Sequence, residues 1–193
     1  MLTDELRKRT SGLTTSIGKS LGKMGVSADA ITFMVLVTGL IAAYYIYMEE
    51  FLIAFILVLV SGIFDGLDGA VAKANQKETK FGALFDSVTD KVTEISWYLA
   101  LGLLSPGLWL PVSLSIAFFM LASYISKHSK AVGGKSGGGI MERKERLVLI
   151  LIGLLRMDWM LSILWIIAIL SIITCFQRFY KNYNILKGLK KEG

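Results

Sequence analysis

Residues 51–91 read "FLIAFILVLVSGIFDGLDGAVAKANQKETKFGALFDSVTDK" and combine membrane-like and acidic sequence. This stretch begins with an apolar run that suits a lipid bilayer and continues with two pairs of aspartates at helical spacing. These aspartates are Asp65, Asp68, Asp86 and Asp90. Because a carboxylate is costly inside hydrocarbon, aspartates at the ends of membrane-suited segments indicate a functional site.

Further apolar blocks on both sides of this stretch set the fold class. The chain has 193 residues, of which 54% are hydrophobic, and its mean hydropathy is +0.60. A helix satisfies its backbone hydrogen bonds within one span, so apolar blocks of about 20 residues predict membrane-spanning helices. We therefore predict an all-α integral membrane protein with one domain over residues 27–185. Its six transmembrane helices are expected at 30–48, 51–73, 82–104, 107–129, 145–156 and 159–180.

The basic residues predict the orientation of these spans. Lys and Arg gather before residue 30, between the second and third spans, between the fourth and fifth spans, and after residue 180. Basic loops stay in the cytoplasm, and an even number of spans places both termini on one side. We expect a multi-pass cell-membrane protein whose termini and aspartates are cytoplasmic. The net charge of +6 then reflects topology and contact with anionic membrane lipids, so no nucleic-acid partner is expected.

The segments outside the spans are short. Residues 1–26 lack the apolar core of a signal peptide and predict an amphipathic helix on the membrane surface. Its apolar side chains recur at helical spacing, and they are Leu6, Leu13, Ile17 and Leu21. Residues 186–193 predict a basic cytoplasmic tail, and "GGKSGGG" at 133–139 predicts a flexible loop. The single cysteine, Cys175, excludes an intrachain disulfide and a site of several thiolates.

The spacing of the aspartates predicts a metal site. Asp65 and Asp68 are three residues apart, and Asp86 and Asp90 are four apart, so each pair shares one helix face. A polar turn between the two helices would bring the pairs together. Four carboxylates in one pocket need positive compensation, and carboxylate oxygens suit Mg²⁺ or Mn²⁺. Two such ions about 3.5–4 Å apart form the arrangement that serves phosphoryl transfer.

Two other interpretations of the aspartates stay open at this point. They could form structural ion pairs with nearby lysines, which are Lys73, Lys80 and Lys91. They could also line the pathway of a divalent-cation transporter. Glu94, one turn beyond Asp90, is the only acidic continuation into the following apolar run, which argues against a pathway.

The aspartate stretch resembles the signature of the CDP-alcohol phosphotransferase family. The resemblance lies in Asp65-x-x-Asp68-Gly69-x-x-Ala72-Lys73, eight further residues, and Gly82-x-x-x-Asp86-x-x-x-Asp90. Seven of the eight signature positions agree. The departure is Lys73, which stands where the family usually has arginine. Lysine keeps the positive charge but cannot form the bidentate hydrogen bonds that arginine makes with a phosphate. The stretches "VSADAIT", "ASYISKHSK" and "GGGIMERKERLVL" resemble other parts of the same family.

The resemblance implies an activity and residue roles. The family transfers a substituted phosphate from a CDP-linked donor to an alcohol and releases CMP. The resemblance implies that the four aspartates bind two Mg²⁺ or Mn²⁺ ions and that Asp90 also acts as catalytic general base. It further implies a homodimer in the membrane. The residues implied to surround the cytidine diphosphate are Asp29, Thr32, Gly69, Lys73, Thr79 and Gly82.

Basic residues at the cytoplasmic ends of the last three spans predict an anionic acceptor. Arg143 and Arg146 resemble arginines that bind the acceptor phosphate in inositol-phosphate-using relatives, and Arg178 and His128 complete the expected set. "SGGGIMERKERL" and "FDSVTDK" resemble enzymes that add myo-inositol phosphate to a CDP-lipid. We therefore expect myo-inositol phosphate as acceptor, with glycerol phosphate as the alternative. The donor is either CDP-diacylglycerol or CDP-archaeol.

Overall fold

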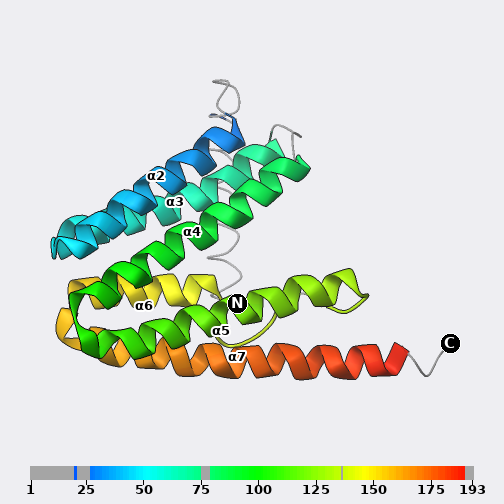
Figure 1. Cartoon of the computed structure of the whole chain (residues 1–193). Coiled ribbons are helices and arrows are strands. Elements are labelled where there is room, and N and C mark those ends of the chain that lie inside the picture. The colour runs from blue at the N-terminus through cyan, green and yellow to red at the C-terminus, as the bar shows by residue number, and fades with distance from the viewer. Residues whose placement is uncertain (1–19, 21–26, 75–78, 136, 190–193) are drawn as a thin grey trace, which may run out of the picture. The chain divides into compact units, whose positions relative to one another are not determined.

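All regular secondary structure in the part that the structure describes is helical. The computed structural model describes Ser20 and residues 27–74, 79–135 and 137–189, with the backbone alone for 68, 70, 72–74 and 189. The helices are α2 (Ala28–Tyr47), α3 (Phe51–Ala74), α4 (Lys80–Leu104), α5 (Trp109–Ala131), α6 (Arg143–Leu155) and α7 (Met160–Leu189) (Figure 1). Two 3₁₀ turns, Pro106–Leu108 and Met157–Trp159, precede α5 and α7. The surface helix predicted for 1–26 lies outside the described residues, apart from Ser20.

The six predicted spans each coincide with one helix. Their ends agree within two residues, except that α7 runs to Leu189 rather than residue 180. Polar contacts one turn apart accompany this extension, because Asn182 Nδ2 donates to Arg178 O at 2.9 Å and Lys187 Nζ donates to Tyr183 Oη at 3.2 Å. The last residues of the predicted tail, 190–193, lie outside the described part.

Three described helical segments are long and apolar enough to cross a membrane. They are Ala28–Tyr47, Pro106–Ala131 and Met157–Gly188. The apolar part of α3 is shorter, Phe51–Leu67, because the aspartates begin near its end. α4 carries charged residues along its first half, and α6 has only 13 residues. The predicted all-helical architecture is confirmed, and the number of six spans stays a prediction.

The chain forms two compact units, Met1–Ala100 and Leu101–Gly193. In the first unit, α2, α3 and the larger part of α4 lie side by side (Figure 1). Gly39 allows α4 to come close to α2, because a side chain at this position would collide with Thr93. Trp97 Nε1 donates to Gly39 O at 2.8 Å, and Ser61 Oγ donates to Val35 O at 3.3 Å. These buried contacts fix the relative positions of the three helices that carry the aspartates and Asp29.

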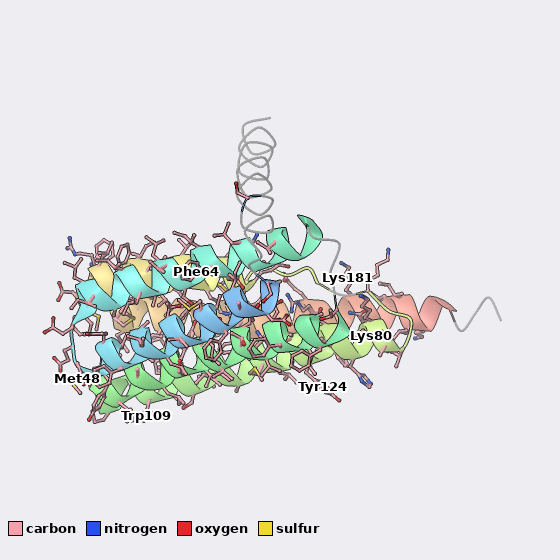
Figure 2. All side chains as sticks on the ribbon, turned by 90° about the horizontal axis from the view of Figure 1, so that it is seen from above. Met48, Phe64, Lys80, Trp109, Tyr124 and Lys181 are labelled. Atoms are coloured by element: carbon pink, nitrogen blue, oxygen red, sulfur yellow. The ribbon has the colours of Figure 1, made fainter. Side chains whose placement is uncertain are left out.

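The second unit is built around α5 and α7, with α6 packed against α7. Phe119 and Leu164 are buried between these helices, and Ser115 Oγ donates to Leu164 O at 3.4 Å. Trp109 and Lys181 lie at opposite ends of this unit (Figure 2).

Candidate active site

Three of the four predicted metal ligands lie together in the first unit. Asp65 on α3 and Asp86 and Asp90 on α4 each offer a carboxylate oxygen, and these oxygens lie within 4.8 Å of one another. All three side chains are half-buried. The helical spacing within each pair and the return of the chain between α3 and α4 account for this convergence. Asp68 lies one turn after Asp65 on α3, and its side chain is outside the described set.

The cluster has the composition and size of a site for a hard divalent cation. Carboxylate oxygens are the preferred protein ligands of Mg²⁺ and Mn²⁺. Oxygens this close to one another can share an ion, and a bound cation would relieve the repulsion between the three acidic groups. The observed geometry therefore fits the predicted metal centre.

Three of the predicted nucleotide-binding residues also come together. Thr79 precedes α4, and its Oγ1 accepts a hydrogen bond from Gly82 N at 2.8 Å, which caps the start of the helix. A Cβ on Gly82 would lie 2.9 Å from both Thr79 Oγ1 and Asp29 Oδ1. Asp29 lies in the first turn of α2, which is capped by Ser27. Glycine at position 82 is thus what allows these two polar side chains to meet beside α4.

The other predicted nucleotide-binding residues are placed differently. Thr32 is buried, and its Oγ1 donates to Ala28 O at 3.2 Å within α2. Gly69 is exposed, and a Cβ added there would meet nothing within 4 Å. Lys73 belongs to α3, but its side chain is outside the described set. The structure therefore groups Asp29, Thr79 and Gly82, while the roles of the other three stay predictions.

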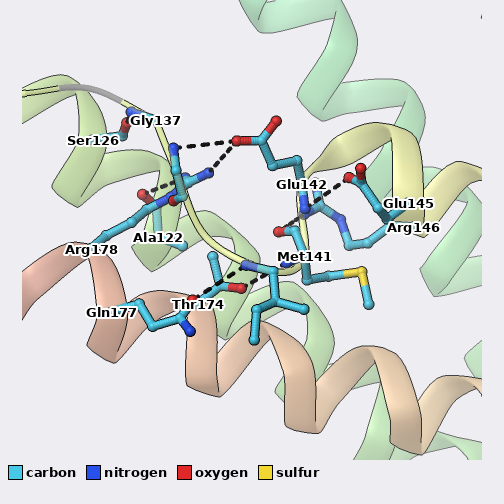
Figure 3. A network of polar contacts seen from close by, with 12 residues as sticks. Ala122, Ser126, Gly137, Met141, Glu142, Glu145, Arg146, Thr174, Gln177 and Arg178 are labelled. Atoms are coloured by element: carbon cyan, nitrogen blue, oxygen red, sulfur yellow. Dashed lines mark hydrogen bonds and ion pairs between the residues drawn. The ribbon is translucent and has the colours of Figure 1, made fainter. Parts of the chain in front are cut away.

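In the second unit, Arg178 is held inside a network of polar contacts (Figure 3). Its Nε donates to Gly138 O at 2.7 Å and its Nη1 donates to Ala122 O at 3.0 Å. Its Nη2 lies 3.8 Å from Glu142 Oε1. Arg178 therefore connects α7 to α5 and to the loop that precedes α6.

Arg143 and Arg146 begin α6, next to the same loop. Arg146 is buried, and its guanidinium carbon lies 4.7 Å from the centre of the Phe119 ring. Its Nη1 also donates to Met141 O at 3.5 Å. Arg143 is half-buried. The structure thus places Arg146 and Arg178 next to residues 138–142, and a shared anion site formed by them stays a prediction.

The glycine-rich loop at 133–139 was expected to be flexible, and its described residues are hydrogen-bonded to the neighbouring helices. Side chains of α5 and α7 accept hydrogen bonds from two of its backbone N–H groups and from those of the two residues that follow it. The pairs are Lys135 N with Asn182 Oδ1 at 2.9 Å, Gly137 N with Ser126 Oγ at 2.7 Å, Ile140 N with Gln177 Oε1 at 3.2 Å, and Met141 N with Thr174 Oγ1 at 2.9 Å. These bonds join the described loop residues to α5 and α7.

The glycines of this loop are required by its conformation. Gly137, Gly138 and Gly139 have φ values of 75°, 82° and 134°, a region that favours glycine. A side chain at Gly139 would also collide with Thr174. Glycine here allows a tight path along α7 and does not indicate mobility.

His128 lies apart from the arginine network. Its ring stacks on Tyr124 with 5.6 Å between centroids. It lines a groove of about 650 Å³ between the ends of α5 and α7, and the other lining residues include Val132, Phe179 and Tyr183 but neither Arg146 nor Arg178. The structure therefore does not group His128 with the predicted phosphate ligands.

Sequence reasoning missed the side chains that hold the loop and the partner of Glu94. One face of α7 carries Thr174, Gln177 and Asn182 together with Arg178. Their helical spacing within an apolar span was the sequence signal that could have identified them as partners of the loop. Glu94 is buried and lies 3.7 Å from Lys91 Nζ. Glu94 thus forms a local ion pair within α4.

Comparison with known proteins identifies the family. The model of the CDP-alcohol phosphatidyltransferase family matches residues 25–177, which include the three clustered carboxylates, Arg143 and Arg146 and end one residue before Arg178. This chain belongs to that family. The chain is 30% identical to the archaetidylinositol phosphate synthase of Pyrococcus horikoshii, over 92% of this chain and 94% of that protein. It is 29% identical to the phosphatidylinositol phosphate synthase of Mycolicibacterium smegmatis, over 86% and 82%.

Solved structures of a CDP-alcohol phosphotransferase agree with this placement. The crystal structure of the phosphatidylinositol phosphate synthase of Mycobacterium tuberculosis with CDP-DAG bound matches with a TM-score of 0.79 and 26% identity, over 88% of this chain and 93% of that one. The structure of the same synthase with manganese and citrate matches with a TM-score of 0.79 over 88% of both chains. The chain is therefore a membrane enzyme that uses a CDP-linked donor, an alcohol acceptor and a divalent metal. Family membership decides against the cation-transporter alternative.

Proposed function

We propose that this CDP-alcohol phosphotransferase transfers a diacylglycerol- or archaeol-phosphate group from a CDP-lipid to myo-inositol phosphate and releases CMP. The main support for the proposal is the cluster of Asp65, Asp86 and Asp90, whose carboxylate oxygens lie within 4.8 Å of one another. The cluster lies where the apolar parts of α3 and α4 adjoin their polar parts. The names of the relatives, which are inositol-phosphate lipid synthases, support the choice of acceptor. Glycerol phosphate is the second candidate acceptor.

The metal centre would consist of Asp65, Asp68, Asp86 and Asp90. Mg²⁺ or Mn²⁺ bound there supplies charge neutralisation for the pyrophosphate and for the leaving CMP. Asp90 lies one turn further along α4 than Asp86, and we assign it as the general base. It accepts the proton of the acceptor hydroxyl while that oxygen forms a bond to the β-phosphorus of the donor, and the bond from this phosphorus to the CMP oxygen breaks.

The nucleotide would bind beside the starts of α2 and α4. Asp29, Thr79 and Gly82 form a compact polar site there, in the same unit as the carboxylates. Thr32, Gly69 and Lys73 complete the proposed set on the strength of their sequence positions. The absence of a side chain at Gly82 keeps Asp29 and Thr79 in place and leaves backbone accessible to a ligand.

A substitution at Gly82 tests this assignment. We expect Gly82→Ala to lower kcat/KM for the CDP-lipid roughly 3- to 10-fold, because the new Cβ would displace the oxygens of Asp29 and Thr79 by a few tenths of an ångström. Alanine favours helix more than glycine does, so weakening of α4 would not explain the loss. Gly66→Ala is the matched control, since a Cβ on Gly66 meets nothing within 4 Å. Equal activity of both variants would contradict the assignment.

The acceptor phosphate would bind in the arginine network of the second unit. Arg146 and Arg178 supply buried or largely buried positive charge beside the loop, and Arg143 stands one turn before Arg146. Guanidinium groups bind phosphate through paired hydrogen bonds. His128 lines the separate groove, so we place it outside this site.

The topology and assembly follow from the same reasoning. The basic segments support cytoplasmic termini and a cytoplasmic active site, so that water-soluble acceptor reaches the aspartates from the cytoplasm. Membrane lipids would surround the exposed apolar faces of the helices. We further propose a homodimer, which rests on the family resemblance alone.

Release of CMP tests the proposed reaction. The purified protein would be incubated with Mn²⁺, CDP-diacylglycerol or CDP-archaeol, and one acceptor at a time. We expect CMP release with myo-inositol phosphate to exceed that with unphosphorylated inositol by about 10-fold or more, because a site built for a charged group rejects an acceptor that lacks it. Release with glycerol phosphate should also be slower, because the relatives are named as inositol-phosphate lipid synthases. Faster release with glycerol phosphate would assign the enzyme to the second candidate reaction.

A further inference from the structure

Arg178 presents one side of its guanidinium to a carboxylate. Its Nε and Nη1 are held by the carbonyl oxygens of Gly138 and Ala122 at 2.7 and 3.0 Å. Both of these partners are neutral. The third nitrogen, Nη2, lies 3.8 Å from Glu142 Oε1, and the Arg178 side chain is only 11% exposed. Glu142 is therefore the anionic group that faces this largely buried cation.

The contact between Glu142 and Arg178 is loose. A separation of 3.8 Å is too long for a hydrogen bond, and the Glu142 side chain is 52% exposed. The same oxygen, Oε1, accepts from Gly138 N at 3.3 Å. Exposed ion pairs of this kind contribute little stability, whereas a phosphate binds arginine through short, charge-assisted hydrogen bonds. A phosphate can thus replace Glu142 at Arg178.

Such a replacement does not require the loop to open. The backbone on either side of Glu142 is held by Gly137 N on Ser126, Ile140 N on Gln177 and Met141 N on Thr174. Glu142 N also donates to Glu145 Oε2 at 3.0 Å at the start of α6. A rotation of the Glu142 side chain into solvent would leave these bonds intact and would break only its own bonds to the backbone N–H groups of Gly138 and Glu145 (Figure 3).

We propose that Glu142 is a built-in competitor that occupies the phosphate-binding side of Arg178 until a phosphorylated acceptor displaces it. This inference rests on the proposed acceptor site. An alcohol without a phosphate cannot displace a carboxylate from arginine, so Glu142 favours phosphorylated acceptors over neutral ones. Glu142 acts through Arg178 and is a positioning residue with an effect on specificity.

The variant Glu142→Gln tests the proposal, because glutamine keeps the length and an acceptor oxygen for Gly138 N but removes the charge. We expect the KM for the phosphorylated acceptor to fall about 2- to 5-fold, the range set by a half-exposed ion pair. The kcat and the KM for the CDP-lipid should stay unchanged. The difference from the original protein should shrink at high salt, which screens exposed charges.

Glu145→Gln is the matched control. Glu145 lies in the same turn of α6, and its carboxylate accepts from Glu142 N and does not face Arg178. We expect its KM for the acceptor to be unchanged. If glutamine at position 142 prevents folding, Glu142→Ser removes the same charge and offers a good N-cap for α6. It should lower the KM in the same direction.

A measurement of phosphate binding tests this inference independently of the proposed reaction. Calorimetric titration of the full chain with inorganic phosphate, without divalent metal, should show binding about 2- to 5-fold tighter to Glu142→Gln. If no phosphorylated acceptor is turned over, the proposed reaction fails and this titration still decides the role of Glu142. Equal or weaker phosphate binding, no detectable binding, or an unchanged or raised acceptor KM would each overturn the inference.

Discussion

Asp90→Asn is expected to abolish transfer while CDP-lipid binding remains largely intact. Asparagine keeps an oxygen at the position where Asp90 meets Asp65 and Asp86, but its amide cannot accept the proton of the acceptor hydroxyl. General-base catalysis contributes roughly 10²- to 10⁴-fold, and the weaker charge of the cluster adds to the loss. Initial rates of CMP release and direct CDP-lipid binding would measure the two effects separately.

The control for this variant is Asp158→Asn. Asp158 lies in the 3₁₀ turn Met157–Trp159 of the second unit, outside the carboxylate cluster. Its replacement removes one acidic charge from the chain and should leave CMP release unchanged. Turnover of Asp90→Asn at a rate near that of the original protein would show that another group accepts the proton.

The second large effect that we expect is the loss of activity when the metal is removed. Excess EDTA should stop CMP release, and Mn²⁺ added beyond the chelator should restore it. Asp65→Ala should remain inactive at Mn²⁺ concentrations that saturate the original protein. The carboxylate cluster then lacks the Asp65 oxygen, which is one of the three that lie within 4.8 Å of one another. The loss should exceed the roughly 10- to 100-fold that follows removal of a ligand's supporting partner.

Thermal unfolding distinguishes a lost metal site from a lost fold. Ligands that bind only the folded state raise its Tm, so Mn²⁺ should raise the Tm of the original protein. Asp65→Ala should unfold cooperatively without metal, since it carries fewer repelling carboxylates, and Mn²⁺ should raise its Tm much less. Full activity in excess EDTA would exclude the metal centre.

Periodicity made most of this structure predictable. Apolar blocks located six helices to within two residues at nearly every end, and spacings of three and four residues placed Asp65, Asp86 and Asp90 on faces that meet. Both results depend on local helix geometry, which is a property of consecutive residues. The exception, the extension of α7 to Leu189, lies in a polar segment where hydropathy carries no signal for helix.

The loop before α6 could not be predicted in the same way. Its hydrogen bonds join residues that are far apart in the chain, such as Gly137 with Ser126 and Met141 with Thr174. The glycines alone were read as flexibility, although positive φ and close packing on Thr174 require them. His128 was grouped with the arginines because all are basic, whereas the direction of its side chain depends on the packing of α5 against α7.

Thr174, Gln177 and Arg178 all belong to α7, and each holds a different residue of the same loop. A rotation or tilt of this one helix would move all three contacts together. Membrane helices adjust their tilt when the hydrocarbon thickness changes. If the acceptor binds at this loop as proposed, its affinity would depend on bilayer thickness, and lipids of different chain length would change the acceptor KM without any substitution in the protein.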